Sequence, residues 1–316
     1  MPPKLSSRRE TLLGFQPPAV GDEEVAAVAG HVSGVVIVHT GATPVFADIR
    51  DSDLNIDPER VAELVTPRTK AVMPVHLYGQ PADLDPIWAL GVPVVEDAAH
   101  AAESEYRGRK IGGLSAATCF SLYATKSIAA GEGGIVATND DGLAERIRDL
   151  TIMRRGHGSL YDIVVPGYKA NLSDVLAAIA LCQLDKVVEH RAARMAQIEL
   201  YDAAVAELDG IDPVARDPRD THAHHLFVVR VDEERAGASR DEYRFALAEE
   251  NIGTSVHFLP VHELTAYRER YPDQAPLPVA ERAGAEVLSL PLSPAHSLDD
   301  IQDVIDALHR VHTAFT

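Results

Sequence analysis

Residues 92–97 constrain the fold more than any other segment, because they have almost no polar residue before they end in Glu-Asp. Strands of this kind are typical of parallel sheets, in which both faces are covered. Further strands are expected at residues 45–49, 71–76, 118–123 and 135–138, and helices at 57–65 and 84–90. Strands that alternate with helices predict an α/β protein built around a mostly parallel sheet. An additional helix is expected from Asp22, with Gly34 as its natural end.

The pattern changes after about residue 208. A loop rich in Pro and Asp is followed by expected strands at 225–231, 254–258 and 287–290. Ser239 with Glu242, and Ser297 with Asp300, have the spacing of helix N-terminal caps. We therefore predict two domains, a large one over residues 1–208 and a small C-terminal one over residues 209–316.

A long helix is expected to begin at Ser173, and its apolar residues cover most of its circumference. Such a helix has to be buried against more than one neighbour. The neighbours are either the sheet alone or the sheet together with a partner subunit.

The composition excludes several classes of function. A net charge of −19 argues against binding to nucleic acid or to an anionic membrane surface, both of which require a basic face. The N-terminus has no apolar core of signal-peptide length, and no stretch reaches the roughly 18 apolar residues of a membrane span. A cytoplasmic protein is expected. Cys119 and Cys182 lie in apolar runs, which favours buried hydrophobic residues over a disulfide or a metal site.

Three polar residues are expected at neighbouring strand ends. Asp97 ends one strand, while Ser121 and Lys126 follow another, ahead of a Gly-Glu-Gly-Gly turn at residues 131–134. Taken singly, they are a cap, a small polar residue and a surface lysine. Together they fit a pyridine cofactor, because a lysine amine forms a Schiff base with an aldehyde and a carboxylate keeps the ring nitrogen protonated. The serine hydroxyl is then placed to donate to a phosphate.

Residues 96–101, 120–126 and 131–134 together resemble the signature of the DegT/StrS-type sugar aminotransferases, which are fold-type I pyridoxal-phosphate enzymes. The likeness extends to residues 74–81, 167–174 and 257–271, and the last of these is most similar to enzymes that aminate a UDP-linked 4-keto-pentose. The resemblance implies pyridoxal 5'-phosphate as cofactor and glutamate as amino donor. It also implies a nucleotide-linked keto-sugar as acceptor, and a homodimer.

The resemblance also assigns roles to individual residues. Lys126 would form the Schiff base and carry the proton, and Asp97 would pair with the pyridine nitrogen. His100 would lie by the phenolic oxygen of the ring, Ser121 would bind the phosphate, and Asn171 would reach the phosphate of the partner subunit's cofactor. Three histidines are expected to bind substrate: His76, His257 and His262.

The chain departs from the family pattern after Gly34. The family has several tens of residues between the first helix and the segment that matches residues 41–46, but here residues 35–38, Val-Val-Ile-Val, follow at once. The absent block normally carries a Gly-Thr-Ala-Ala-type phosphate loop, an aromatic residue that stacks on the ring, and a central strand. No Gly-Thr-Ala-Ala sequence occurs in this chain. Residues 35–38 are either a replacement strand, which β-branched residues favour, or the end of a helix, as the resemblance implies.

Three alternatives remain beside the transferase hypothesis. The shortened chain could be a weakly active or non-catalytic family member that acts as a structural or regulatory partner. The dehydratase branch of the family replaces the Schiff-base lysine with histidine, and Lys126 argues against it. A lysine aldolase without pyridoxal phosphate would leave Asp97 unexplained.

Overall fold

The computed structural model describes residues 31–156 and 162–316. Its first sheet has three strands, in the order β1 (Val95–Asp97), β4 (Ala117–Ser121) and β5 (Gly134–Ala137). Strands β1 and β4 are parallel, whereas β4 and β5 are antiparallel. The sheet brings the ends of β1 and β4 to one edge, as the sequence predicts.

Residues 71–76 lie beside β1, although they pair with it only through bridges. Val72 forms a parallel bridge with Val94, and Val75 forms one with Asp97. Residues 45–49 and 254–258 do not form the strands that we expected. In each, one residue forms an isolated bridge, and the Phe46 N–H donates instead to the Gln274 side chain at 3.3 Å. Ser255 lies beside the edge strand β10, where it exchanges both backbone hydrogen bonds with Ser289, but its neighbours do not continue the pairing.

Helix α1 (His31–His39) runs through Gly34. The expected end at Gly34 is therefore wrong, and residues 35–38 are helical rather than a replacement strand. The part of the expected helix before residue 31 lies outside the described residues. At Gly34, α1 approaches α9 (Thr265–Arg270) so closely that a Cβ there would lie 2.6 Å from the Tyr267 hydroxyl. Glycine suits this position because any side chain there would overlap the Tyr267 ring.

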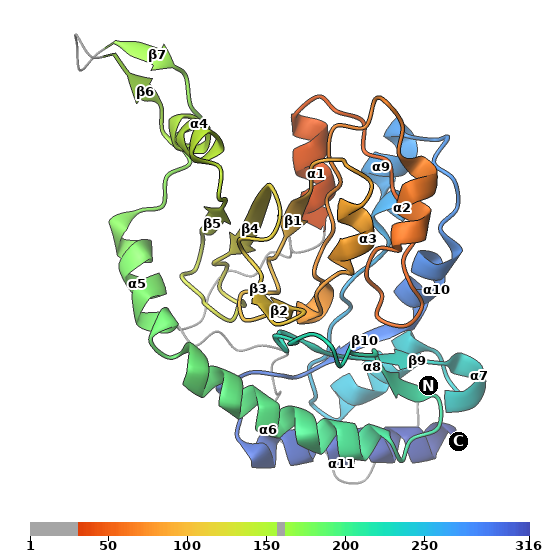
Figure 1. Ribbon diagram of the computed structural model, residues 1–316. Coiled ribbons are helices and arrows are strands. Elements are labelled where there is room, and N and C mark those ends of the chain that lie inside the picture. The colour runs from red at the N-terminus through yellow and green to blue at the C-terminus, as the bar shows by residue number, and fades with distance from the viewer. Residues whose placement is uncertain (1–30, 157–161) are drawn as a thin grey trace.

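Short helices and a hairpin surround the first sheet (Figure 1). Asp57 caps α2 by accepting from the Glu59 N–H at 2.9 Å, and a proline begins the helix, as predicted. The elements of this region are α2 (Pro58–Leu64), the 3-10 turn η1 (Leu77–Gly79), α3 (Leu84–Trp88), β2 (Glu105–Tyr106) and β3 (Arg109–Lys110).

A second, antiparallel sheet has the order β10-β9-β8 and consists of β8 (Ile211–Pro213), β9 (Phe227–Val231) and β10 (Val287–Leu290). Helices α6 (Val187–Val205) and α11 (Leu298–Phe315) lie side by side along it (Figure 1). Its core includes Tyr201 and Phe227, whose rings stack at 4.8 Å. The remaining elements are α7 (Glu233–Ala236), α8 (Arg240–Glu249), η2 (Val261–Glu263) and α10 (Pro278–Glu286).

Both predicted capping boxes are present, at Ser239 ahead of α8 and at Ser297 ahead of α11. The core of this region also takes in Ile198 and Val205 from α6, which precede residue 208. A domain boundary at residue 208 stays a prediction.

An arm projects away from both sheets (Figure 1). It consists of α4 (Asp141–Thr151), β6 (Arg154–Arg155) and β7 (Ile163–Val165), and α5 (Asp174–Leu184) follows it. Helix α5 is capped by Ser173, as predicted, but Val175 is 71% exposed and Leu181 is 65% exposed. The chain's own sheet therefore does not cover this apolar helix. Within the described ranges, no helix is long and apolar enough to cross a membrane.

Candidate active site

Asp97 ends β1 with both carboxylate oxygens hydrogen-bonded. The Ala99 N–H donates to Oδ1 at 3.0 Å, and the Ser33 hydroxyl of α1 donates to Oδ2. The side chain is partly exposed. Because a carboxylate oxygen accepts two hydrogen bonds, each oxygen keeps capacity for one more donor.

Lys126 lies on the loop after β4, and it is 8% exposed. Hydrogen bonds close this loop at its base, from the Leu122 N–H to Gly133 O at 2.9 Å and from the Ala130 N–H to Leu122 O at 2.8 Å. Gly133 has a φ of 144°, and a Cβ there would lie 2.7 Å from Leu172 Cδ1. Glycine at position 133 thus allows the Gly-Glu-Gly-Gly turn to pack closely against its neighbours at the base of the lysine loop.

Burial lowers the pKa of Lys126 to about 8, and the charge of Asp97 opposes this by raising it. A buried ammonium loses its hydration, which favours the neutral amine. At pH 7 roughly one amine in ten is then neutral, against about one in 3,000 for an unshifted lysine. The neutral amine is the form that attacks an aldehyde.

Three imidazoles lie around Lys126. The rings of His100 and His225 are 4.5 Å apart, and Phe258 stacks on His100 at 6.0 Å. Burial lowers the pKa of His100 and His225 well below the ordinary value and that of His257 to about 4, and the charge of Lys126 lowers all three further. These histidines are therefore neutral at physiological pH, and an aromatic surface lies beside the amine.

Ser121 and the other predicted ligands differ in their positions. Ser121 ends β4, five residues before Lys126, and its hydroxyl accepts from the Tyr123 N–H at 3.2 Å. Asn171 is exposed ahead of α5, where its Oδ1 accepts from the Lys169 amine and its amide donates to Leu172 O at 3.4 Å. The described chain does not bring Asn171 into the group around Lys126.

The three predicted substrate histidines are held by protein groups. His76 is fully buried, with Nε2 2.8 Å from Glu96 Oε2 and Nδ1 accepting from the Ala82 N–H at 3.0 Å. Protein groups therefore engage both ring nitrogens of His76, and its role in substrate binding stays a prediction.

His257 and His262 contact the C-terminal region. His257 Nδ1 lies 2.9 Å from Ser289 Oγ, and its carbonyl accepts from the Tyr78 hydroxyl. His262 Nε2 lies 3.1 Å from Glu281 Oε1. Burial and the charge of Lys126 lower the pKa of His257.

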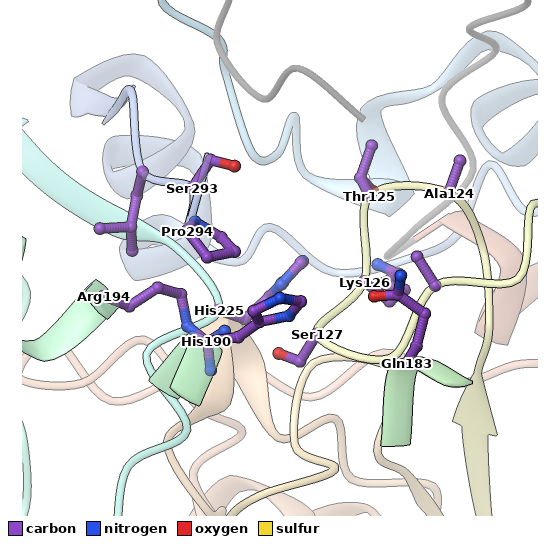
Figure 2. Close-up of a pocket in the computed structure, with 12 residues that line it drawn as sticks. Ala124, Thr125, Lys126, Ser127, Gln183, His190, Arg194, His225, Ser293 and Pro294 are labelled. Carbon is purple, nitrogen blue, oxygen red and sulfur yellow. The ribbon is translucent and has the colours of Figure 1, made fainter. Parts of the chain in front are cut away.

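A small cavity of about 50 Å³ adjoins Lys126 (Figure 2). Lys126, Ser127 and Gln183 lie on one side of it, Arg194 and Pro294 on the other, with His190 and His225 between them. It has room for a few water molecules but not for a sugar nucleotide. Among the described residues, no cluster of His, Cys, Asp and Glu could hold a metal ion.

Two residues of the site were not predicted from the sequence. Ser33 contacts Asp97 across 64 positions of the chain, and it lies where the family pattern breaks, so no local motif marked it. His225 stands at the start of a predicted strand, where a pair of histidines ahead of an apolar run was an available signal.

The side chains around Lys126 fit a pyridine aldehyde that carries a phosphate. The set comprises a buried amine of lowered pKa, a carboxylate with free acceptor capacity, a stacked imidazole and a serine hydroxyl. Tyr123 adds a buried hydroxyl without a hydrogen-bond partner among the described residues. Lys126 and Asp97 would hold the reactive ring, and Ser121 would hold its phosphate.

Known proteins share this sequence and architecture. Spore coat polysaccharide biosynthesis protein SpsC of Bacillus subtilis (strain 168) is 44% identical over 292 residues, which cover 87% of this chain and 75% of that protein. S. venezuelae DesV, solved in complex with a ketimine intermediate, is 36% identical, with a TM-score of 0.81 over 88% of this chain and 75% of that chain. Helicobacter pylori PseC, an aminotransferase of pseudoaminic acid biosynthesis, is 25% identical, with a TM-score of 0.85 over 91% and 78%.

The family model of the DegT/DnrJ/EryC1/StrS aminotransferases matches residues 13–309. That match and the identity to SpsC confirm the resemblance and the fold-type I assignment. The chain belongs to the DegT/DnrJ/EryC1/StrS aminotransferase family, whose members are sugar aminotransferases that use pyridoxal phosphate.

Proposed function

We propose that the chain transfers an amino group from glutamate to a nucleotide-linked keto-sugar, with pyridoxal phosphate held covalently on Lys126. The observation that carries the proposal is the buried Lys126 amine, whose pKa is about 8, within electrostatic reach of Asp97. The sugar part is supported by SpsC and by DesI, which was solved with its TDP-sugar product and is 37% identical, with a TM-score of 0.81 over 89% of this chain and 71% of that chain.

The residues divide the work by chemistry. When bound, the cofactor supplies an electron sink for the carbon that gains or loses the amino group. Asp97 holds the ring nitrogen protonated through its free acceptor capacity, and Ser121 donates to the phosphate. The Lys126 amine would move a proton at the reacting carbon, and its lowered pKa suits it to do so near neutral pH.

The covalent anchor can be tested directly. The protein is incubated with pyridoxal phosphate, reduced with borohydride and digested, and the peptides are mapped by mass. The pyridoxyl group is expected on Lys126. Lys110 and Lys169 are internal controls because both are on the same chain but neither is buried. A group found on either of them, or on none, would sink the anchor and favour the non-catalytic alternative.

The acceptor and donor need a separate experiment. TDP- and UDP-linked 4-keto-sugars are offered with ¹⁵N-glutamate, and the amino-sugar product is identified by mass. Incorporation of ¹⁵N is expected with a nucleotide-linked sugar and not with the free keto-sugar. ¹⁵N-aspartate serves as the donor control. Equal transfer to the free sugar would contradict the role of the nucleotide.

We also propose a homodimer, in which a second copy covers α5. The exposed apolar residues of α5 would otherwise remain in water. Asn171 lies just ahead of the N-terminus of this helix. A partner seated on α5 would bring Asn171 towards the partner's cofactor phosphate, which is the role that the family resemblance gives it. The exposed apolar side chains of this helix and of the start of α6 are Val175, Leu181, Leu184 and Val188.

A further inference from the structure

Among the described residues, Ser33 is the one side chain from another element that forms a hydrogen bond with the Asp97 side chain. Its hydroxyl donates to Oδ2, while the Ala99 N–H donates to Oδ1 at 3.0 Å. Two donors on different oxygens fix the rotation of the carboxylate about its last bond. Because each oxygen accepts a second hydrogen bond, the two donors orient the group without filling it.

A second contact, next to Ser33, holds α1 in place. Gly34, the next residue, is buried against Tyr267, which is 6% exposed. The Tyr267 ring is itself held edge-on by Phe46, at 5.5 Å between centroids. A side chain larger than glycine at position 34 would overlap the Tyr267 ring, so either the ring or the helix that carries Ser33 would have to shift.

We propose that Ser33 is a positioning residue for Asp97, and that it orients the carboxylate toward the pyridine nitrogen of the cofactor. This rests on the proposed function, in which Asp97 receives the ring nitrogen. A carboxylate that is already oriented loses less freedom when the cofactor binds, so the cofactor binds more tightly. The charged and titratable groups that respond to Asp97 are Lys126 and Cys119, whose pKa values it raises.

The first test compares cofactor affinity in matched variants. Ser33→Ala is expected to raise the Kd for pyridoxal phosphate, measured by visible absorbance, by about tenfold, which corresponds to about 1.4 kcal/mol. Ser33→Thr keeps the hydroxyl and is expected to stay close to the wild type. Thr40→Ala is the control, since it removes a hydroxyl just after the same helix that donates only to Ile37 O. Wild-type affinity in Ser33→Ala, or tighter binding, would overturn the proposal.

The second test needs no cofactor. The reactivity of Lys126 toward cyanate is followed against pH in the cofactor-free protein by peptide mass, with Lys110 as an internal reference. Without the Ser33 hydrogen bond, the Asp97 carboxylate is free to turn toward the Lys126 ammonium. The midpoint of the Lys126 pH titration is therefore expected to rise in Ser33→Ala and to return in Ser33→Thr. An unchanged midpoint would overturn the proposal that Ser33 positions Asp97. If wild-type Lys126 takes up no pyridoxal phosphate, the proposed function fails instead, while the midpoint still reports on Ser33.

Discussion

The energetic cost of burying the Lys126 amine can be measured from the pH dependence of the free energy of unfolding. Burial lowers the pKa of this amine from 10.5 to about 8, so the unfolded chain binds more protons between these values than the folded chain does. The free energy of unfolding therefore rises with pH from about 8 to 10.5 and is lowered by about 3 kcal/mol below pH 8. Urea unfolding of the cofactor-free protein at pH 7 and 10, compared with Lys126→Met, checks this. The variant is expected to be the more stable at pH 7 by a margin that shrinks at pH 10; a margin independent of pH would contradict it.

Asp97 has a separable role in the chemistry. Asp97→Asn keeps the size of the side chain but replaces one acceptor oxygen with an NH2 donor and removes the charge that keeps a ring nitrogen protonated. Cofactor is expected to remain bound, while turnover falls by roughly 100-fold or more, the scale of losing a key electrostatic group. Absorbance measures the first quantity and a half-reaction with glutamate the second. Near-normal turnover in the variant would refute the assignment.

Residues within one motif could be predicted from the sequence, and residues that meet across the chain could not. Asp97, Ser121 and Lys126 follow neighbouring strands, so the order of the chain already placed them at one edge. Ser33 reaches this edge from α1, which is distant in the sequence and contacts α9 through residues 34 and 267. The engagement of both ring nitrogens of His76 likewise depends on long-range packing.

At the scale of elements, helices with local signals were predicted well. Ser239 and Ser297 each satisfy their own helix N-terminus within three residues, so the sequence alone marks the start. A strand, by contrast, needs a partner strand that can be far away in the sequence. Residues 45–49 and 254–258 have apolar strand-like sequences, yet only isolated bridges form there.

Helix α5 provides a test of assembly. Leu184→Glu places a charge on the proposed interface and is expected to shift the protein from dimer to monomer, because burying an unpaired carboxylate is costly. Leu298→Glu is the matched control, since both leucines are 49% exposed and Leu298 lies on α11. Sedimentation velocity of both variants measures the outcome. A wild-type monomer, or a dimer that tolerates Leu184→Glu, would show that α5 is not the interface.

For the whole molecule, the family block that this chain lacks after Gly34 is expected to affect how tightly the cofactor binds. The sequence lacks the Gly-Thr-Ala-Ala loop of the family, which supplies a helix N-terminus to the phosphate, an effect of about 0.3–1 kcal/mol. It also lacks the stacking aromatic residue of the block, worth about 0.5–1.5 kcal/mol. Together these losses predict a Kd for pyridoxal phosphate weaker by about tenfold or more than that of a complete site.

The structure indicates where a family-like block has to be inserted to test this. An insertion after Gly34 would divide α1 and separate it from Asp97, whereas one between residue 30 and His31 leaves α1 and the Ser33 contact intact. Pyridoxal phosphate is then titrated into this chain, into the chain with the block, and into a chain with a Gly/Ser-rich insert of equal length. The block is expected to tighten binding by about tenfold or more, and the Gly/Ser insert to leave it unchanged. Equal, tight binding by all three would mean that the chain has rebuilt its phosphate site from residues such as Ser121 and Tyr123.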